Sequence, residues 1–233
     1  MENRFNNLTS KEWLPFQKSW FKFENKFSLI EKNLRFFTKA SEKKKENVFI
    51  KSNISQSEIN ELCKKNNLKL NKDIDKNLTF GLIDLLNLEK KQDIDVIIDQ
   101  TIETSKKIIE KLDEKKFLCI LTKNFMINNE YYPFAWDLAY EISKIFSLKD
   151  EKIGCLENKD FPNNSLTNNS IFYNLYFKKD ENSKNSFDKK NKRYELKSFD
   201  LSNLNQFNIN TWNIIKPKPR KKDEILHPAK YPE

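Results

Sequence analysis

The chain has 233 residues, of which 37% are hydrophobic and 33% charged, and its formal net charge is +9. This length and apolar content suit one large α/β domain better than two small ones. The mean hydropathy of −0.81 and the absence of any apolar run near the ~18 residues of a membrane helix argue against a membrane protein. With no signal-peptide pattern at the N-terminus, we expect a cytoplasmic location.

Cysteine and glycine usage restrict the possible sites. Cys63, Cys119 and Cys155 are far apart and odd in number, which predicts buried thiols rather than a metal site or a disulfide framework. Gly81 and Gly154 are the only glycines in the chain. A loop that brings its backbone against a nucleotide-like ligand usually needs two or three glycines within a few residues, so the sequence predicts no such loop.

Three residue pairs have the spacing of a capping box, in which a hydroxyl and a carboxylate satisfy the first free amides of a helix. They are Thr9 with Glu12, Ser28 with Glu31, and Ser55 with Glu58. These pairs predict helices that open the aromatic segment Trp13–Phe23 and the segments SLIEKNLRFF and SEINELCKK. Between the last two segments, NVFI at 47–50 is typical of a short strand.

The middle of the chain predicts an alternation of helices and strands. Isoleucines and leucines at helical spacing predict a helix over Asp95–Leu112, and the short apolar run Phe117–Leu121 predicts a buried strand. Pro133 is placed to begin a further helix. The predicted inner face of that helix comprises Phe134, Leu138, Ile142 and Ile145.

Two further strands are predicted over Glu151–Leu156 and Ile171–Phe177. This order indicates an α/β sheet closed by an antiparallel edge, within a domain spanning 1–179. The polar stretch 180–193 is expected to be a mobile insertion or linker, and 194–233 a basic C-terminal extension. The predicted core includes Phe117, Leu118, Ile120, Phe134, Leu138 and Ile142.

Several segments, taken in order, resemble one family. They are 8–21 (LTSKEWLPFQKSWF), 28–39 (SLIEKNLRFFTK), 117–140 (FLCILTKNFMINNEYYPFAWDLAY), 151–159, 169–178 and the final HPAKYPE. Together they resemble the amino-type (adenine-N6/cytosine-N4) site-specific DNA methyltransferases of restriction–modification systems. The resemblance implies a Rossmann-like sheet, S-adenosylmethionine as cofactor, and methyl transfer to an exocyclic amino group of adenine or cytosine in DNA.

The departures from that family indicate a degenerate or truncated member. After FFTK the family has a glycine loop, commonly Asp-Pro-Phe-x-Gly-x-Gly, whereas this chain continues ASEKKKENVFIKSNIS, with Lys43, Lys44 and Lys45 on the expected approach. The family's catalytic Asp/Asn/Ser-Pro-Pro-Tyr is also missing. We expect the region LTFGLIDLLNL at 78–88 to join the flanks of the lost loop. Cofactor binding by this chain is therefore doubtful.

The clearest candidate DNA contact is a basic run in the C-terminal extension. Its prolines, Pro217 and Pro219, would hold the segment extended, so that the cations could neutralise phosphates along a DNA backbone. The alternative is a solvated tail. The candidate DNA-binding residues are Lys216, Lys218, Arg220, Lys221 and Lys222.

Two other features permit a functional and a structural interpretation. The single histidine, His227, could act as a general base, but no partner or substrate is evident and a structural turn is the favoured interpretation. The aromatic residues near Pro133 could stack on a base, but aromatics that open an apolar helix usually belong to the core. They are Tyr131, Tyr132, Phe134 and Trp136.

Three roles stay open. The chain could be one piece of a split enzyme, in which a second polypeptide supplies the glycine loop and the Pro-Pro-Tyr segment and follows where Glu233 ends this one. It could instead be a non-catalytic DNA-binding or partner subunit that keeps the sheet as a platform. It could also be a remnant without a role. In each case we expect the isolated chain not to transfer methyl groups.

Overall fold

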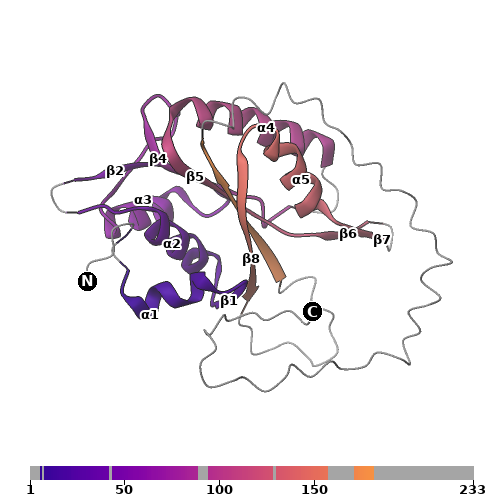
Figure 1. Ribbon diagram of the computed structural model, residues 1–233, viewed down its shortest axis with the longest axis horizontal. Coiled ribbons are helices and arrows are strands. Elements are labelled where there is room, and N and C mark those ends of the chain that lie inside the picture. Colours follow the sequence, from indigo (N-terminus) through magenta and orange to yellow (C-terminus); the bar gives the residue numbers. More distant parts are fainter. Residues whose placement is uncertain are drawn as a thin grey trace, which may run out of the picture. The chain divides into compact units, whose positions relative to one another are not determined.

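The computed structural model describes residues 6, 8–41, 44–88, 94–127, 130–156 and 171–180. A seven-stranded sheet with the order β1-β8-β9-β5-β4-β2-β3 forms its centre (Figure 1). A separate two-stranded hairpin pairs β6 with β7. Within this described part, no helix is both long and apolar enough to cross a membrane.

The sheet is parallel apart from one strand. Strand β9 is antiparallel to both of its neighbours, β5 and β8, and the remaining neighbouring pairs are parallel. The predicted α/β sheet is therefore confirmed, but the expected antiparallel edge was wrong. The antiparallel strand β9 lies inside the sheet between β5 and β8, and the edge strands β1 and β3 are parallel to their neighbours. The strands of the main sheet are β1 (Trp20–Phe23), β2 (Glu46–Lys51), β3 (Leu68–Leu70), β4 (Leu78–Asp84), β5 (Leu112–Thr122), β8 (Ser147–Leu156) and β9 (Ile171–Lys178).

Helices cover both faces of the sheet (Figure 1). Helices α2 (Lys26–Phe37) and α3 (Gln56–Lys65) bury their apolar sides against one face, and α4 (Ile94–Lys111) and α5 (Phe134–Ser143) against the other. Two hydrophobic clusters result, one on each side, as expected for strands that alternate their side chains between the faces. The smaller elements are α1 (Ser10–Trp13), the 3-10 helix η1 (Leu14–Gln17), β6 (Phe125–Ile127) and β7 (Glu130–Tyr132).

Two of the three predicted capping boxes are present, at Thr9 with Glu12 and at Ser55 with Glu58. The third was wrong, because α2 begins at Lys26 and its cap is Asn25. The Asn25 side chain accepts a hydrogen bond from the Ser28 amide at 2.9 Å, and the Ser28 hydroxyl accepts one from the Asn25 amide at 3.3 Å. Ser28 is thus the third residue of α2 rather than its cap.

The aromatic segment at the N-terminus is not one helix. After the single turn of α1 and the turn of η1, Trp20–Phe23 forms β1 at the edge of the sheet. Phe21 and Phe23 are buried while Trp20 and Lys22 are exposed. This alternation with a period of two is the strand pattern, and the expectation of a continuing helix missed it.

The predicted core is confirmed for Leu118, Ile120, Phe134, Leu138 and Ile142, which have no solvent exposure. Phe117 differs because it is only partly buried. Its ring lies on the α2 side of the sheet, with its centroid 4.9 Å from that of Phe37. Neighbouring residues of a strand face opposite sides, so Phe117 and Leu118 contribute to different clusters.

The segment expected to bridge a lost loop is instead a strand inside the sheet. Residues 78–84 form β4, which pairs with β2 on one side and β5 on the other. Gly81 lies where a Cβ atom would come 3.2 Å from Ile108 Cγ2 and 3.3 Å from Leu118 Cδ1. This glycine therefore serves close packing between β4 and α4, not the approach of a ligand to the backbone.

Candidate functional site

The strand order places a topological switch point between β2 and β4. From β2 the chain passes to β3 on one side of it, and then to β4 on the other side. In open α/β sheets, ligands bind beyond the carboxyl ends of the strands at such a point. A ligand site is therefore expected at the carboxyl ends of β2, β4 and the adjacent β5.

Each of these three strands ends in polar residues. Ser52 follows β2, Asp84 is the last residue of β4, and Lys123 follows β5. The residues two positions earlier are Ile50, Leu82 and Leu121, and all three belong to the cluster beneath α2 and α3. Because side chains two apart on a strand share a face, the three polar residues turn toward the α2 side of the sheet.

The Asp84 carboxylate is the centre of this cluster, and its side chain has no solvent exposure. Its Oδ1 accepts a hydrogen bond from the Leu86 amide at 2.9 Å, and its Oδ2 accepts one from Ser52 Oγ at 2.5 Å. The same Oδ2 lies 3.2 Å from Lys26 Nζ, which also donates to Asn87 Oδ1 at 2.5 Å. A buried carboxylate needs such compensation, and here three segments of the chain supply it through Leu86, Ser52 and Lys26.

Two lysines make the cluster electropositive. Lys26 is the first residue of α2, where the helix dipole disfavours a positive charge, so its contact with Asp84 is what stabilises it there. Lys123 is partly buried, and burial together with the nearby charge of Lys26 lowers the pKa of its ammonium. A partly buried lysine with a lowered pKa at the carboxyl ends of the strands is a common mark of a functional site.

A cavity of about 360 Å³ lies at the same strand ends. Its polar lining comes from the β2 and β4 ends and from α4, and its apolar lining from the start of α4 and the turn after β4. The lining residues are Lys51, Asn53, Asp84, Leu85, Leu88, Val96, Ile97, Gln100 and Thr101.

The connection from β2 to α3 does not fit S-adenosylmethionine in the way that a glycine loop would. Such a loop offers its amides and the space left by missing side chains. Here the Ile54 amide donates to Ser52 Oγ at 3.2 Å, the Ser55 amide to Glu58 Oε2 at 2.8 Å, and the Glu58 amide to Ser55 Oγ at 3.2 Å. These amides are engaged by the chain's own side chains, and we derive no methyl-transfer step through them.

The lysines expected on the cofactor approach lie elsewhere. Lys44 and Lys45 precede β2, at the amino ends of the parallel strands and opposite the switch-point cluster. That expectation was wrong because the strand begins after these lysines, and the loop at its carboxyl end is 52–55. Lys43, His227 and the basic run Lys216, Lys218, Arg220, Lys221 and Lys222 lie outside the described residues, as do 181–193 and 194–233.

The aromatic residues near Pro133 divide between core and surface. Phe134 is fully buried, whereas Trp136 is 57% exposed. The rings of Tyr132 and Phe134 have centroids 6.5 Å apart, and the Tyr131 side chain is outside the described part. The core interpretation is thus confirmed for Phe134 and wrong for Trp136, which points to the outside of α5.

The three cysteines are free thiols. Cys63 and Cys119 are buried, as predicted, and Cys155 is partly buried. Burial raises the pKa of Cys63 to about 11 and that of Cys119 well above its ordinary value. Both thiols stay protonated at neutral pH, so nucleophilic chemistry at them is disfavoured.

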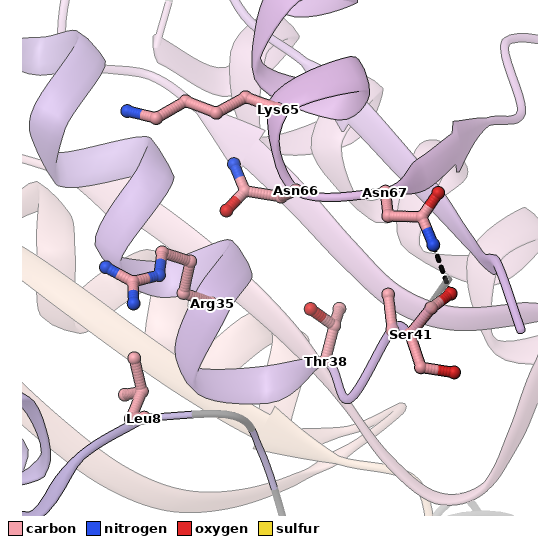
Figure 2. Close-up of a pocket in the computed structure, with 8 residues that line it drawn as sticks. Leu8, Arg35, Thr38, Ser41, Lys65, Asn66 and Asn67 are labelled. Carbon is pink, nitrogen blue, oxygen red and sulfur yellow. Dashed lines mark hydrogen bonds between the residues drawn. The ribbon is translucent and has the colours of Figure 1, made fainter. Parts of the chain in front are cut away.

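A second pocket, of about 330 Å³, lies at the amino edge of the sheet (Figure 2). Lys65, Asn66 and Arg35 surround it, and the Asn67 side chain donates to the Ser41 carbonyl. Lys65 Nζ pairs with Glu31 Oε1 at 2.8 Å, and Arg35 Nη2 with Glu12 Oε1 at 2.6 Å. Its cations are thus paired and complement the carboxyl ends of α2 and α3, which indicates a structural role.

The sequence interpretation missed Lys26, Ser52, Asp84 and Lys123. A signal was present, because each of the apolar runs NVFIK, LTFGLI and FLCILT is followed directly by a polar residue. Reading the ends of successive parallel strands as one edge would have brought three of these residues together. Lys26 belongs to a helix and could not be found in this way.

No protein-family model matches the sequence, and no curated protein matches it. Solved structures of similar fold include a candidate DNA modification methylase of Thermus thermophilus, with TM-score 0.37 and 11% identity over 58% of this chain and 53% of that chain. The chain thus spans about half the length of that methylase. Another is N-methyltransferase NodS of Bradyrhizobium japonicum WM9 with S-adenosyl-L-homocysteine, with TM-score 0.38 and 7% identity over 58% of this chain and 78% of that chain.

A third similar structure is a candidate methyltransferase of Thermoplasma acidophilum, with TM-score 0.34 and 8% identity over 70% of this chain and 67% of that chain. Because all three TM-scores are below 0.5, the fold class rests on the strand order and on the helix layers described above.

Proposed function

We propose that this chain is a DNA methyltransferase-like protein that binds DNA and is inactive alone, as one piece of a split enzyme. The observation that carries the proposal is the position of Asp84. It places a buried carboxylate at the carboxyl end of β4, next to the switch point of the sheet. This is the position where an α/β sheet presents groups to a ligand.

The surroundings of Asp84 support the non-catalytic part of the proposal. Lys26 and Ser52 already occupy the Oδ2 atom of its carboxylate. An incoming amino group would have to displace one of them before it could donate to that oxygen. The amides after β2 are engaged as well, so a second polypeptide would have to supply the cofactor loop for methyl transfer to occur.

The DNA part of the proposal rests on charge. The formal net charge is +9, and the switch-point cluster adds two lysines to one carboxylate at a single edge. The basic run Lys216–Lys222 carries further cations in a proline-containing sequence. Positive charge at several places suits contacts with phosphates.

A non-catalytic partner subunit of a DNA-modifying enzyme is the second candidate. The observation that favours it is the Lys26–Asp84 pair, which fills the site from within. The two candidates differ in one respect that can be tested. A split-enzyme piece would gain methyl-transfer activity when mixed with the polypeptide that bears the glycine loop, and a partner subunit would only alter the DNA affinity of an enzyme active without it.

The DNA contact can be tested by the salt dependence of binding. The triple variant Lys218→Ala, Arg220→Ala and Lys222→Ala should weaken binding to all duplexes alike, and should flatten the slope of log K against log salt by roughly two to three units. The reason is that lysines make point-charge contacts to phosphates, whereas base contacts need side chains held rigidly in a groove. Fluorescence anisotropy with two unrelated duplexes over a range of salt concentrations measures both quantities.

A matched control is the triple variant Lys64→Ala, Lys69→Ala and Lys106→Ala, which removes three exposed cations of the described domain. It should leave the slope closer to that of the native chain. Equal affinity and equal slope for the native chain and the Lys218, Arg220 and Lys222 variant would show that the basic run is only solvated.

A further inference from the structure

Lys123 is a partly buried lysine whose charge has no local compensation. It follows β5 at the carboxyl edge, and within the described part of the chain its ammonium makes no hydrogen bond or ion pair. Burying an ammonium without a partner is unfavourable. Packing alone therefore does not explain why a lysine occupies position 123.

The nearby carboxylate does not supply that compensation. Asp84 is engaged by the Leu86 amide, by Ser52 and by Lys26. Lys26 in turn uses two contacts, to Asp84 and to Asn87. Since an ammonium has three donors, one donor of Lys26 and all three of Lys123 are available for a further acceptor.

The charges at this edge favour an anion as that acceptor. Lys26 pairs with Asp84, and the charge of Lys26 acts on Lys123, so this cluster holds two ammonium groups and one carboxylate. Lys51, at the end of β2, lines the cavity with residues of α4. Burial and the charge of Lys26 both lower the pKa of Lys123. A bound anion would offset both the cost of burial and the repulsion by Lys26, because its negative charge would attract both ammonium groups.

We propose that Lys26 and Lys123 together form a binding site for an anionic oxygen group, such as a phosphate or pyrophosphate, at the carboxyl edge of the sheet. The site lies beside Asp84 at the switch point, where the fold presents groups to ligands. It does not depend on DNA binding by the basic run. A nucleic-acid backbone and a free phosphate compound offer the same chemistry.

Anion binding would also change the state of Asp84. An anion that engages Lys26 competes with the Asp84 carboxylate for its ammonium. The Lys26–Asp84 contact would lengthen, and Asp84 Oδ2 would become available to another donor. The anion site and the carboxylate would thus be coupled through one side chain.

Calorimetric titration with inorganic pyrophosphate at low ionic strength tests the proposal. The full-length chain should bind pyrophosphate saturably, and Lys26→Met and Lys123→Met should each weaken that binding by about tenfold or more. Methionine keeps the length of the side chain and removes the charge. Because both variants retain the basic C-terminal run, its contribution cancels in the comparison.

The matched control is Lys64→Met, which removes an exposed lysine from the last turn of α3, at the opposite end of that helix from the site. It should bind pyrophosphate within about twofold of the native chain. Circular dichroism melting of each variant shows that it is folded. Equal binding by all four proteins, an equal loss in Lys64→Met, or no binding by the native chain would overturn the proposal.

A short oligothymidylate distinguishes the two sources of phosphate. If it binds more tightly than pyrophosphate and loses affinity in Lys26→Met and Lys123→Met, the site takes a nucleic-acid backbone. If only pyrophosphate responds to these two substitutions, the site takes a free phosphate compound. DNA binding by the basic run is tested separately, on Lys218, Arg220 and Lys222. The anion-site proposal can therefore fail while the DNA proposal holds, and the reverse.

Discussion

Lys26 Nζ lies 3.2 Å from Asp84 Oδ2 and joins the first turn of α2 to the carboxyl end of β4. The two residues are 58 positions apart in sequence. The pair fixes α2 above the switch point and fills the place where a ligand's donor group would meet Asp84. This contact therefore bears on both the stability of the fold and the proposed function.

Replacing Asp84 tests how much the contact stabilises the fold. Asp84→Ala should lower the free energy of unfolding by about 1–3 kcal/mol, because the Leu86 amide and Ser52 lose a buried acceptor. Asp84→Asn should cost less, since it keeps an acceptor for the amide. Urea denaturation measures both, with Asp99→Ala on the exposed side of α4 as control. A loss below about 0.5 kcal/mol for Asp84→Ala would remove its structural role.

The core beneath α5 gives a prediction about packing. Leu138 is fully buried against the α4–α5 side of the sheet, and Leu138→Ala should cost about 2–5 kcal/mol, the usual range for emptying a core leucine. Tyr140, two residues later, is 52% exposed, and Tyr140→Ala should cost less than about 1 kcal/mol. Similar losses for the two variants in thermal denaturation would place α5 outside the core.

Glu12 predicts a pH dependence of stability. Hydrogen bonds from the Thr9 amide and hydroxyl, and then the Arg35 guanidinium, lower the pKa of Glu12 to about 2 from 4.5. A carboxyl group whose pKa is lower in the folded state stabilises the fold above its unfolded pKa, and this contribution fades as pH falls from 4.5 toward 2. The stability difference between the native chain and Glu12→Gln should therefore shrink on acidification.

Denaturant titrations from about pH 6 to about pH 3 measure that difference. Glu61→Gln on the exposed side of α3 is the matched control, because it removes a carboxylate without disturbing a helix cap. A difference for Glu12→Gln that stays constant over this range would contradict the assignment of the cap and the Arg35 pair as its cause.

The sequence predicted the parts of the fold that depend on local pattern. Leu138 and Ile142 have helical spacing and are buried in α5, and the apolar run at Leu118 forms a buried strand. The predicted capping box at Ser55 is present, because there the side-chain pair Ser55 and Glu58 is sufficient to define the first residue of the helix. At Ser28 the same spacing failed, because Asn25 satisfies the first amides one turn earlier.

The candidate site depended on features that local pattern does not contain. Asp84 and Lys26 meet only because β4 lies inside the sheet and α2 crosses above its carboxyl end. The order of motifs along the chain does not determine the order of strands in a sheet. The prediction that 78–88 joins the flanks of a lost loop was wrong for this reason. A polar residue at a strand end becomes a site only when the neighbouring strands are known.

Calorimetric titration of the isolated full-length chain with S-adenosylmethionine tests the central claim most directly. That claim is that the chain's own side chains occupy the groups that a cofactor would need. We predict no measurable heat of binding, or a dissociation constant weaker than about 1 mM, because the Ile54, Ser55 and Glu58 amides are engaged by Ser52, Glu58 and Ser55. A dissociation constant of about 1 μM would contradict this and would show that the chain holds the cofactor on its own.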